Sequence, residues 1–269
     1  MESPAHSRRS FIRHAATGLL VPTLMSSVVR GSAPLPLGFW KSASAAGAAA
    51  ITPNSFADLG AWWKADSITG LNNNDPVSTW NDSNGANHFS GSGTSRPLWL
   101  SNASGGMPGV KFDAINDEMS MASILTLTAT SWTLITVLIG GGGGCQFGQS
   151  GVNMLMQSGP GVSFYNPSDG TTPGADAFST SNANLCVAVV RSSYSGGYHI
   201  TFRENKTARG DRAVGSFNYT FSRLCHYNQN TVWGGQTFCE IIFYNRPLSD
   251  ADCDSLYDGY LKPKYSALP

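Results

Sequence analysis

Charged side chains are scarce in this chain. Asp, Glu, Lys and Arg make up 13% of it, and 17 basic groups balance 17 acidic ones, which is roughly half the charged fraction of an average globular protein. Five of the basic groups but only one acidic group lie in residues 1–50, so the remainder carries 12 basic and 16 acidic side chains. This mildly acidic body lacks the basic surface that binds nucleic acid or anionic membranes. The 11% aromatic content argues against a disordered tail.

No apolar run is long enough to span a bilayer. The longest, residues 15–29, contains Gly18 and Pro22 and covers about 15 residues, against the roughly 20 that a spanning helix needs. It follows a basic segment and precedes a stretch of small residues, the arrangement of an export signal. The alternatives are a basic N-terminal helix or a membrane anchor.

The basic segment reads SRRSFIR over residues 7–13. Its paired Arg8 and Arg9, followed by Phe11, resemble the twin-arginine signal of bacteria. This resemblance implies export to the periplasm or the cell exterior. We expect cleavage after Ala33 or within residues 45–50, so that residues 1–50 are signal and linker and the mature domain spans 51–269, with no membrane span.

Cysteine is also limited, with five residues that all follow position 144. No CxxC or Cys/His spacing indicates zinc, and an odd number leaves at least one thiol outside any set of disulfides. Cys186 lies in an apolar run and is expected to act as a small core residue. Cys225 and Cys239 flank a turn-rich stretch and can pair in an oxidising envelope.

Short β-branched and aromatic runs recur between Gly- and Pro-rich breakers, a pattern that favours strands. The clearest runs cover residues 132–139, 185–191, 198–203 and 239–244. Few helical patterns accompany them, so the sequence predicts an all-β sandwich or barrel. The glycine run 140–144 lacks the Lys-Ser/Thr of a phosphate loop and is expected to be a hairpin loop.

One helix is predicted, at the C-terminal end. Ser249 suits its N-cap, and Asp252 occupies the capping-box position three residues later. Pro263 is expected to end it. The D-x-D-x-D pattern there also opens calcium loops of the EF-hand, but Ser255 and Leu261 stand where that loop needs Gly and Glu.

Several motifs along the domain occur in a characteristic order. They are LGAWWKAD (59–66), VSTWND (77–82), GVKFDAINDE (109–118), EIIFYNRPLSD (240–250) and YLKPKY (260–265). This order resembles the bacterial LamG-like, concanavalin A-like lectin/glucanase jelly rolls. The resemblance implies an antiparallel two-sheet jelly-roll sandwich with a short C-terminal helix packed beside it. Ala114 departs from the pattern, since the family often has Gly there.

Groups able to catalyse glycoside cleavage are few. That reaction normally needs two carboxylates, and the domain has only three glutamates, namely Glu118, Glu204 and Glu240. Glu240 lies on a predicted strand, where Ile242 and Tyr244 share its face, and we expect it to pair with a nearby base. His199, Arg203, His226 and Tyr227 are conceivable members of a lyase site, although no lyase motif is present.

Binding residues are better represented. Sugar rings stack on aromatic side chains, and their hydroxyls bond to amides and carboxylates. Trp80 and either Trp62 or Trp63 fit inward strand positions and are expected in the core. Trp233 lies in a polar loop together with Asn230, which makes this pair the best candidate for glycan stacking.

Two weaker candidates complete the set. Tyr165 and Asn166 form a second possible ligand-binding pair. Asp113, Asn116 and Asp117 offer clustered oxygens on a turn, which suit either Ca²⁺ or capping of the turn through backbone N–H groups.

Three functions follow from these observations. The leading interpretation is an exported, non-catalytic carbohydrate-binding or adhesion module of the bacterial cell envelope, recognising a glycan or a cell-surface polysaccharide. The alternatives are a polysaccharide-degrading glycosidase or lyase of the same fold, and a structural envelope protein without a small ligand.

Overall fold

The computed structural model describes the unit that spans Ala48–Pro269. The described residues are 50–128, 130–140, 144–148, 154–158, 162–163, 184–194, 196–214, 216, 218–226 and 234–269. Several predictions fall outside these ranges, namely the export signal with Arg8, Arg9 and Phe11, and the site candidates Tyr165, Asn166, Tyr227, Asn230 and Trp233. The hairpin expected at 140–144 is wrong, because the strands at Thr133–Ile139 and Gly144–Gly148 belong to different sheets.

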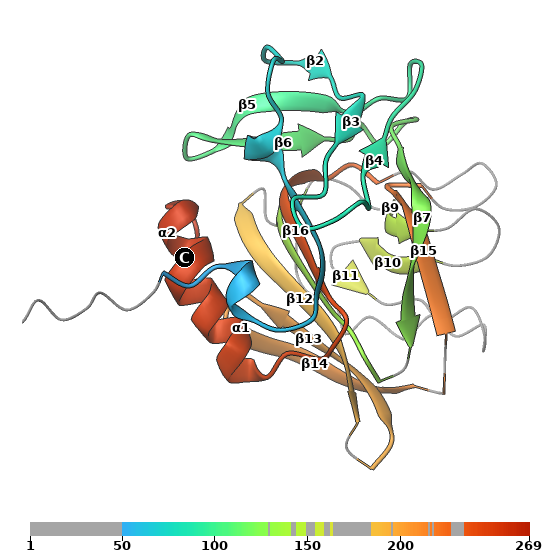
Figure 1. The fold of residues 1–269 in the computed structure, drawn as a ribbon, viewed down its shortest axis with the longest axis vertical. Coiled ribbons are helices and arrows are strands. Elements are labelled where there is room, and N and C mark those ends of the chain that lie inside the picture. Colours follow the sequence, from blue (N-terminus) through green and yellow to red (C-terminus); the bar gives the residue numbers. More distant parts are fainter. Residues whose placement is uncertain are drawn as a thin grey trace, which may run out of the picture. The chain divides into compact units, whose positions relative to one another are not determined.

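The described strands form two antiparallel sheets (Figure 1). The first has the order β14 (Thr207–Val214), β13 (Tyr198–Glu204), β12 (Leu185–Tyr194), β8 (Thr133–Ile139), β16 (Thr237–Tyr244), β6 (Met107–Lys111), β5 (Leu98–Ser104) and β2 (Asp75–Pro76), with β1 (Leu59–Lys64) also paired to β16. The second has the order β11 (Val162–Ser163), β10 (Met154–Ser158), β9 (Gly144–Gly148), β15 (Asn218–Leu224), β7 (Met119–Thr128), β4 (Phe89–Ser90) and β3 (Thr79–Trp80). The predicted all-β, two-sheet jelly-roll sandwich is confirmed, as are the four strand runs.

Aromatic side chains fill the space between the sheets. Trp63, Trp80, Phe89, Phe147 and Phe221 are all fully buried there, and the Phe89 ring contacts the rings of both Trp63 and Trp80. The expectation that Trp80 and either Trp62 or Trp63 lie in the core is confirmed, with Trp63 as the second core residue.

A second apolar cluster covers the opposite face of the first sheet. Val187, Val189 and Ile242 pack there against helical residues such as Leu256 and Leu261. Figure 1 shows the C-terminal helix, in red, beside β12, β13 and β14. Because both faces of the central strands are covered, these strands appear in the sequence as continuous apolar runs rather than alternating ones.

The C-terminal helical segment consists of α1 (Asp250–Leu256), the π-helical turn η3 (Tyr257–Leu261) and α2 (Lys262–Lys264), while two 3₁₀ turns, η1 (Pro53–Ser55) and η2 (Ala65–Ser67), lie near β1. The predicted capping box is confirmed, because the Ser249 hydroxyl accepts from the Asp252 N–H at 3.0 Å and the Asp252 carboxylate accepts from the Ser249 N–H at 3.2 Å. Pro263 does not end the helix as predicted. It takes one of the first two positions of α2, where a missing N–H costs little.

The suggested bond between Cys225 and Cys239 does not form, since Cys239 is a free thiol. The reason is positional: Cys225 belongs to the core between the sheets, and Cys239 belongs to the cluster on the far face of the first sheet. Cys186 is a buried core residue, as predicted. Burial raises the pKa of the Cys186 and Cys239 thiols to about 12, so both stay protonated.

Candidate functional site

Glu240 is the most enclosed carboxylate of the domain, with no exposed surface. Trp62 Nε1 and the Tyr260 hydroxyl donate to Oε1, while Lys264 Nζ at 2.8 Å and the Tyr265 hydroxyl at 2.7 Å donate to Oε2. The expectation that Glu240 pairs with a nearby base is therefore confirmed. Burial and the charge of Glu240 raise the pKa of both tyrosines, so both hydroxyls remain donors.

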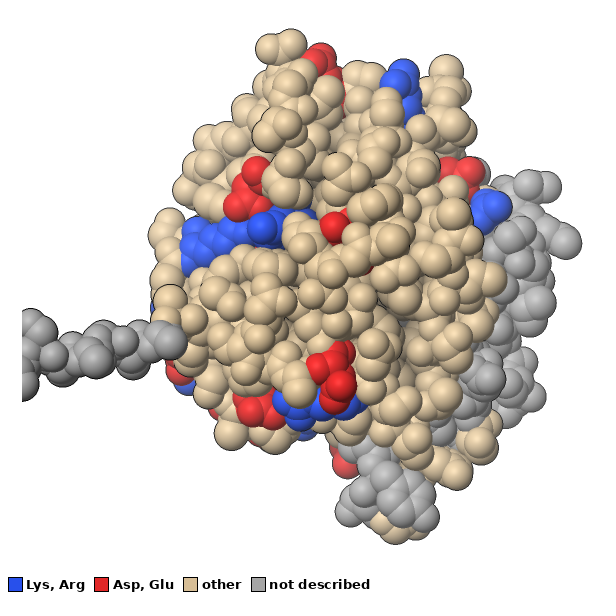
Figure 2. Space-filling model, viewed as in Figure 1, with Lys and Arg blue, Asp and Glu red and all other residues tan. Residues whose placement is uncertain are grey.

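The other two glutamates also have basic partners. The Glu204 carboxylate lies 2.7 Å from Arg209 Nη2. Glu118 Oε2 lies 3.1 Å from Arg223 Nη1 and contacts His226 Nδ1. Figure 2 shows the same arrangement more generally: charged side chains are sparse on the viewed face, and basic and acidic surfaces adjoin.

The turn at residues 113–117 uses its carboxylates to bind backbone. Asp113 Oδ1 accepts from the N–H groups of Ile115 at 2.8 Å and Asn116 at 3.1 Å, and Asp117 Oδ2 accepts from the Asp113 N–H at 2.9 Å. Ala114 has a φ of 63°, a left-handed conformation that favours glycine. Among the described residues no group of three or more His, Cys, Asp or Glu side chains is placed to hold a metal ion. The turn-capping alternative accounts for these contacts, and calcium stays a prediction.

Asp117 makes the stability of this turn sensitive to pH. Its residue is 5% exposed, and burial together with the charge of Asp113 raises its pKa from 3.8 to about 6. The unfolded chain releases this proton near pH 4 and the folded chain near pH 6, so Asp117 stabilises the fold fully below pH 4 and less as the pH rises through 6. We expect a loss of about 3 kcal/mol across that window.

Urea unfolding of the wild type and Asp117→Asn from pH 4 to pH 8 measures this loss. The amide cannot ionise and still offers an oxygen to the Asp113 N–H. The stability of the variant relative to the wild type should therefore rise with pH. Parallel pH profiles for the two proteins would contradict the assignment.

The described residues that flank the segment 227–233 contact each other, and those that follow it contact this turn. The Gly234 N–H donates to the Cys225 carbonyl at 3.1 Å, and the Phe112 N–H donates to the Gln236 carbonyl at 3.0 Å. At Gly235 a Cβ atom would lie 2.8 Å from the Ala114 Cβ, so only glycine fits this approach. The structure thus places the calcium candidate turn beside Gly235 and Gln236, the residues that follow the segment holding Asn230 and Trp233.

Glu118, Arg223 and His226 form a polar triad. In the chain, Glu118 follows the turn 113–117, and Arg223 and His226 lie close to Cys225. Arg223 faces Ser120 across the β7–β15 pair, and Glu118 is two residues from Ser120, so its side chain reaches the same face. The Glu118 side chain is 31% exposed. This triad cannot be read from the sequence, because Glu118 and Arg223 are 105 residues apart. Only the strand register brings them together.

The four residues considered for a lyase site are not assembled into one. His199 bonds to Asp211 at 2.8 Å on the first sheet. Arg203 binds Asp250 and Asp254 at the start of the C-terminal helix. His226 follows the last residue of β15 in the second sheet, and Tyr227 lies outside the described residues.

No protein-family model and no curated protein sequence matches this chain. Solved structures share its architecture at low identity. The binding domain of Paraclostridial Mosquitocidal Protein 1 superposes with a TM-score of 0.51 and 8% identity over 76% of this chain and 52% of that chain.

Two enzyme structures superpose less well. A Trypanosoma rangeli sialidase in complex with 2,3-difluorosialic acid gives a TM-score of 0.45 and 13% identity over 75% of this chain. A GH54 α-L-arabinofuranosidase gives 0.48 and 12% identity over 68% of this chain and 50% of that chain. The chain spans 33% of the sialidase. The likeness to the mosquitocidal-protein domain shows the fold alone.

None of the helices in the described part of the chain has the length and apolar character needed to cross a membrane.

Proposed function

We propose that residues 51–269 form an exported, non-catalytic domain that binds carbohydrate at a rim that includes the turn 113–117 and the residues 227–233, whose described neighbours Gly235 and Gln236 contact that turn. The observation that carries this proposal is the anchoring of that segment at both ends on the sandwich. A loop held by a rigid frame is a common position for binding residues. The likeness to the binding domain of Paraclostridial Mosquitocidal Protein 1 supports the frame and not the ligand.

The chemistry of the rim suits a polyhydroxylated ligand. Glu118 and Arg223 are partly exposed and supply an acceptor and a fork of donors for sugar hydroxyls. In the same proposal Trp233 provides the stacking face and Asn230 an amide partner, with Tyr165 and Asn166 as a second contact pair.

The partners of the three glutamates support a non-catalytic role. Glu240 is bound by four donors, Glu204 by Arg209 and Glu118 by Arg223 and His226. A glycosidase needs two carboxylates that flank one bond, whereas these three occupy separate ion pairs.

A glycan array with the processed protein tests the binding proposal. Trp233→Ala is expected to lower the affinity for the retained glycan by about tenfold or more, because ring stacking is lost. Trp233→Phe keeps a stacking face and should retain most of the affinity. Failure of the wild type to retain any glycan would reject the proposal. Release of cleaved sugar from a bound polysaccharide would reject its non-catalytic part in favour of a glycosidase or lyase.

Export by the twin-arginine route has its own test. An Arg8→Lys, Arg9→Lys double variant keeps the charge but removes the paired guanidinium groups. We expect the unprocessed variant to remain in the cytoplasm, as measured by cell fractionation and immunoblotting, while the wild type reaches the periplasm or medium. Equal export of both proteins would count against this route.

A further inference from the structure

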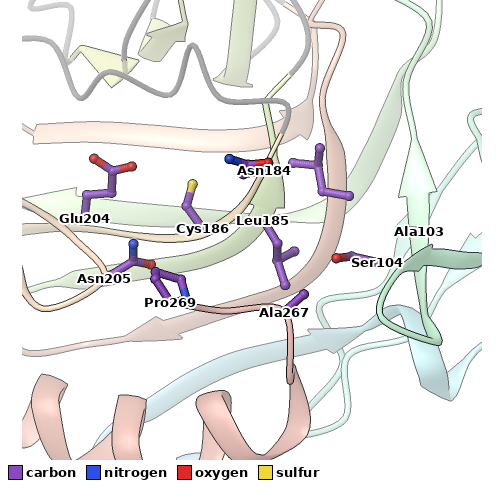
Figure 3. Close-up of a pocket in the computed structure, with 10 residues that line it drawn as sticks. Ala103, Ser104, Asn184, Leu185, Cys186, Glu204, Asn205, Ala267 and Pro269 are labelled. Carbon is purple, nitrogen blue, oxygen red and sulfur yellow. The ribbon is translucent and has the colours of Figure 1, made fainter.

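The ion pairs of the three glutamates differ in how far they reach the surface. Glu204 borders a cavity of about 530 Å³ at the end of the first sheet (Figure 3), but the residue is 4% exposed and its carboxylate lies 2.7 Å from Arg209. Glu240 is fully buried with its four donors. In the third pair, the side chains of Glu118 and Arg223 are 31% and 26% exposed, so a ligand can reach this pair.

Arg223 uses only one corner of its guanidinium for contacts within the described residues. Nη1 lies 3.1 Å from Glu118 Oε2 and 2.6 Å from His226 Nδ1. Nε and Nη2 have no acceptor in the described part of the chain. Arg191 and Arg246 differ from it, because each donates its Nε–H to another residue of the fold. Arg223 thus retains an edge of two N–H donors that the fold does not use.

The strand register places this edge among short side chains at the end of the second sheet. Arg223 lies opposite Ser120 of β7 and opposite Gly148 of β9. Cross-strand neighbours share one face of a sheet, so the long guanidinium extends past both of them. Arg223 also lies two residues before Cys225, whose carbonyl accepts from the Gly234 N–H. The edge therefore borders the rim at which glycan binding is proposed.

We propose that the Nε–Nη2 edge of Arg223 binds the carboxylate of an acidic sugar, such as a uronate, so that the glycan at the rim is an acidic one. This inference rests on the proposed function and names the ligand class of the same site. Two parallel N–H donors match the two oxygens of a carboxylate, and such charge-assisted bonds are stronger than bonds to neutral hydroxyls. Glu118 and His226 hold Nη1, so the donors are oriented before the ligand arrives.

Titration calorimetry with the processed protein tests this inference. The probes are oligomers of galacturonate and of glucuronate, and sialyllactose, each compared with its methyl ester, which keeps the sugar and removes the charge. We expect at least one acid to bind and its methyl ester to bind at least about tenfold more weakly. Poly-glutamate and a sulfated galactan carry anions on other frames, and we expect both to bind more weakly than the acid.

Arg223→Lys keeps the positive charge but loses the fork of donors. It should bind the acid about tenfold more weakly than the wild type, bind the methyl ester equally, and melt at nearly the same temperature. Arg246→Lys is the matched control, because the Arg246 side chain has a similar exposure of 32% but pairs with Asp252 at the C-terminal helix. This control should bind the acid as the wild type does.

Four results would overturn the inference: equal binding of acid and methyl ester, equal or tighter binding of poly-glutamate or the sulfated galactan, unchanged binding by Arg223→Lys, or an equal loss in Arg246→Lys. Retention of neutral glycans alone would overturn it and leave the proposed function standing, whereas a protein that retains no glycan would reject both. The comparison of acid with ester needs only the wild type, so it decides the matter even if Arg223→Lys does not fold.

Discussion

Replacing Glu240 with alanine is expected to lower the free energy of unfolding by about 3–5 kcal/mol, because it leaves a buried cation and three polar donors without their acceptor. Lys264 Nζ keeps its contacts with Asp66, with Tyr260 and with the Tyr265 ring. The same carboxylate joins β16 to β1 through Trp62 and to the C-terminal helix through Tyr260 and Tyr265. Its loss therefore loosens two elements at once.

Urea denaturation followed by tryptophan fluorescence measures this effect. Glu118→Ala is the matched control: its ion pair is partly exposed, so its loss should cost under about 1 kcal/mol. A double variant, Glu240→Gln with Lys264→Met, removes both charges and should recover part of the stability lost in Glu240→Ala. Equal destabilisation by Glu240→Ala and Glu118→Ala would contradict the role assigned to Glu240.

Arg203→Ala is expected to cost about 3 kcal/mol and to loosen the start of the C-terminal helix. Its side chain is 7% exposed, with Nη2 2.6 Å from Asp254 and Nη1 2.8 Å from Asp250. Nη2 also donates to the Lys206 carbonyl at 2.9 Å. Without the guanidinium, two carboxylates on one turn of α1 face each other with less neutralising charge.

Lys206→Ala provides the comparison, since Lys206 pairs with Asp258 on the same helical segment but both side chains are exposed. An exposed pair contributes little, so this variant should unfold almost as the wild type does. Hydrogen exchange should also show faster exchange of the α1 amides in Arg203→Ala but not in Lys206→Ala. If the two variants behave alike, burial does not distinguish these ion pairs.

Local features were predictable from the sequence because they depend on neighbours in the chain. The Ser249 capping box needs only Asp252, three residues away. The strand at 133–139 needs only an apolar β-branched run between breakers. The motif EIIFYNRPLSD likewise placed Glu240 on a strand. A carboxylate buried on a strand is costly unless it is paired, so a basic partner for Glu240 could be expected.

The choice of partners was not predictable in the same way. Nothing near Glu240 in the sequence identifies Lys264, and the pairing of Cys225 with Cys239 was wrong because the two thiols lie on opposite faces of the first sheet. The helix also continues past Pro263, because a π-helical turn precedes it and gives the proline a first-turn position.

The pattern of apolar runs, turns and caps was thus enough to specify a two-layer antiparallel domain with a terminal helix, since each of these features acts within a few residues. The contacts of Glu118 with Arg223 and His226, and of Glu240 with Trp62 and Lys264, arise from strand register and sheet order. Register is set by how whole faces pack against each other, so these sites appear only when the two layers are assembled.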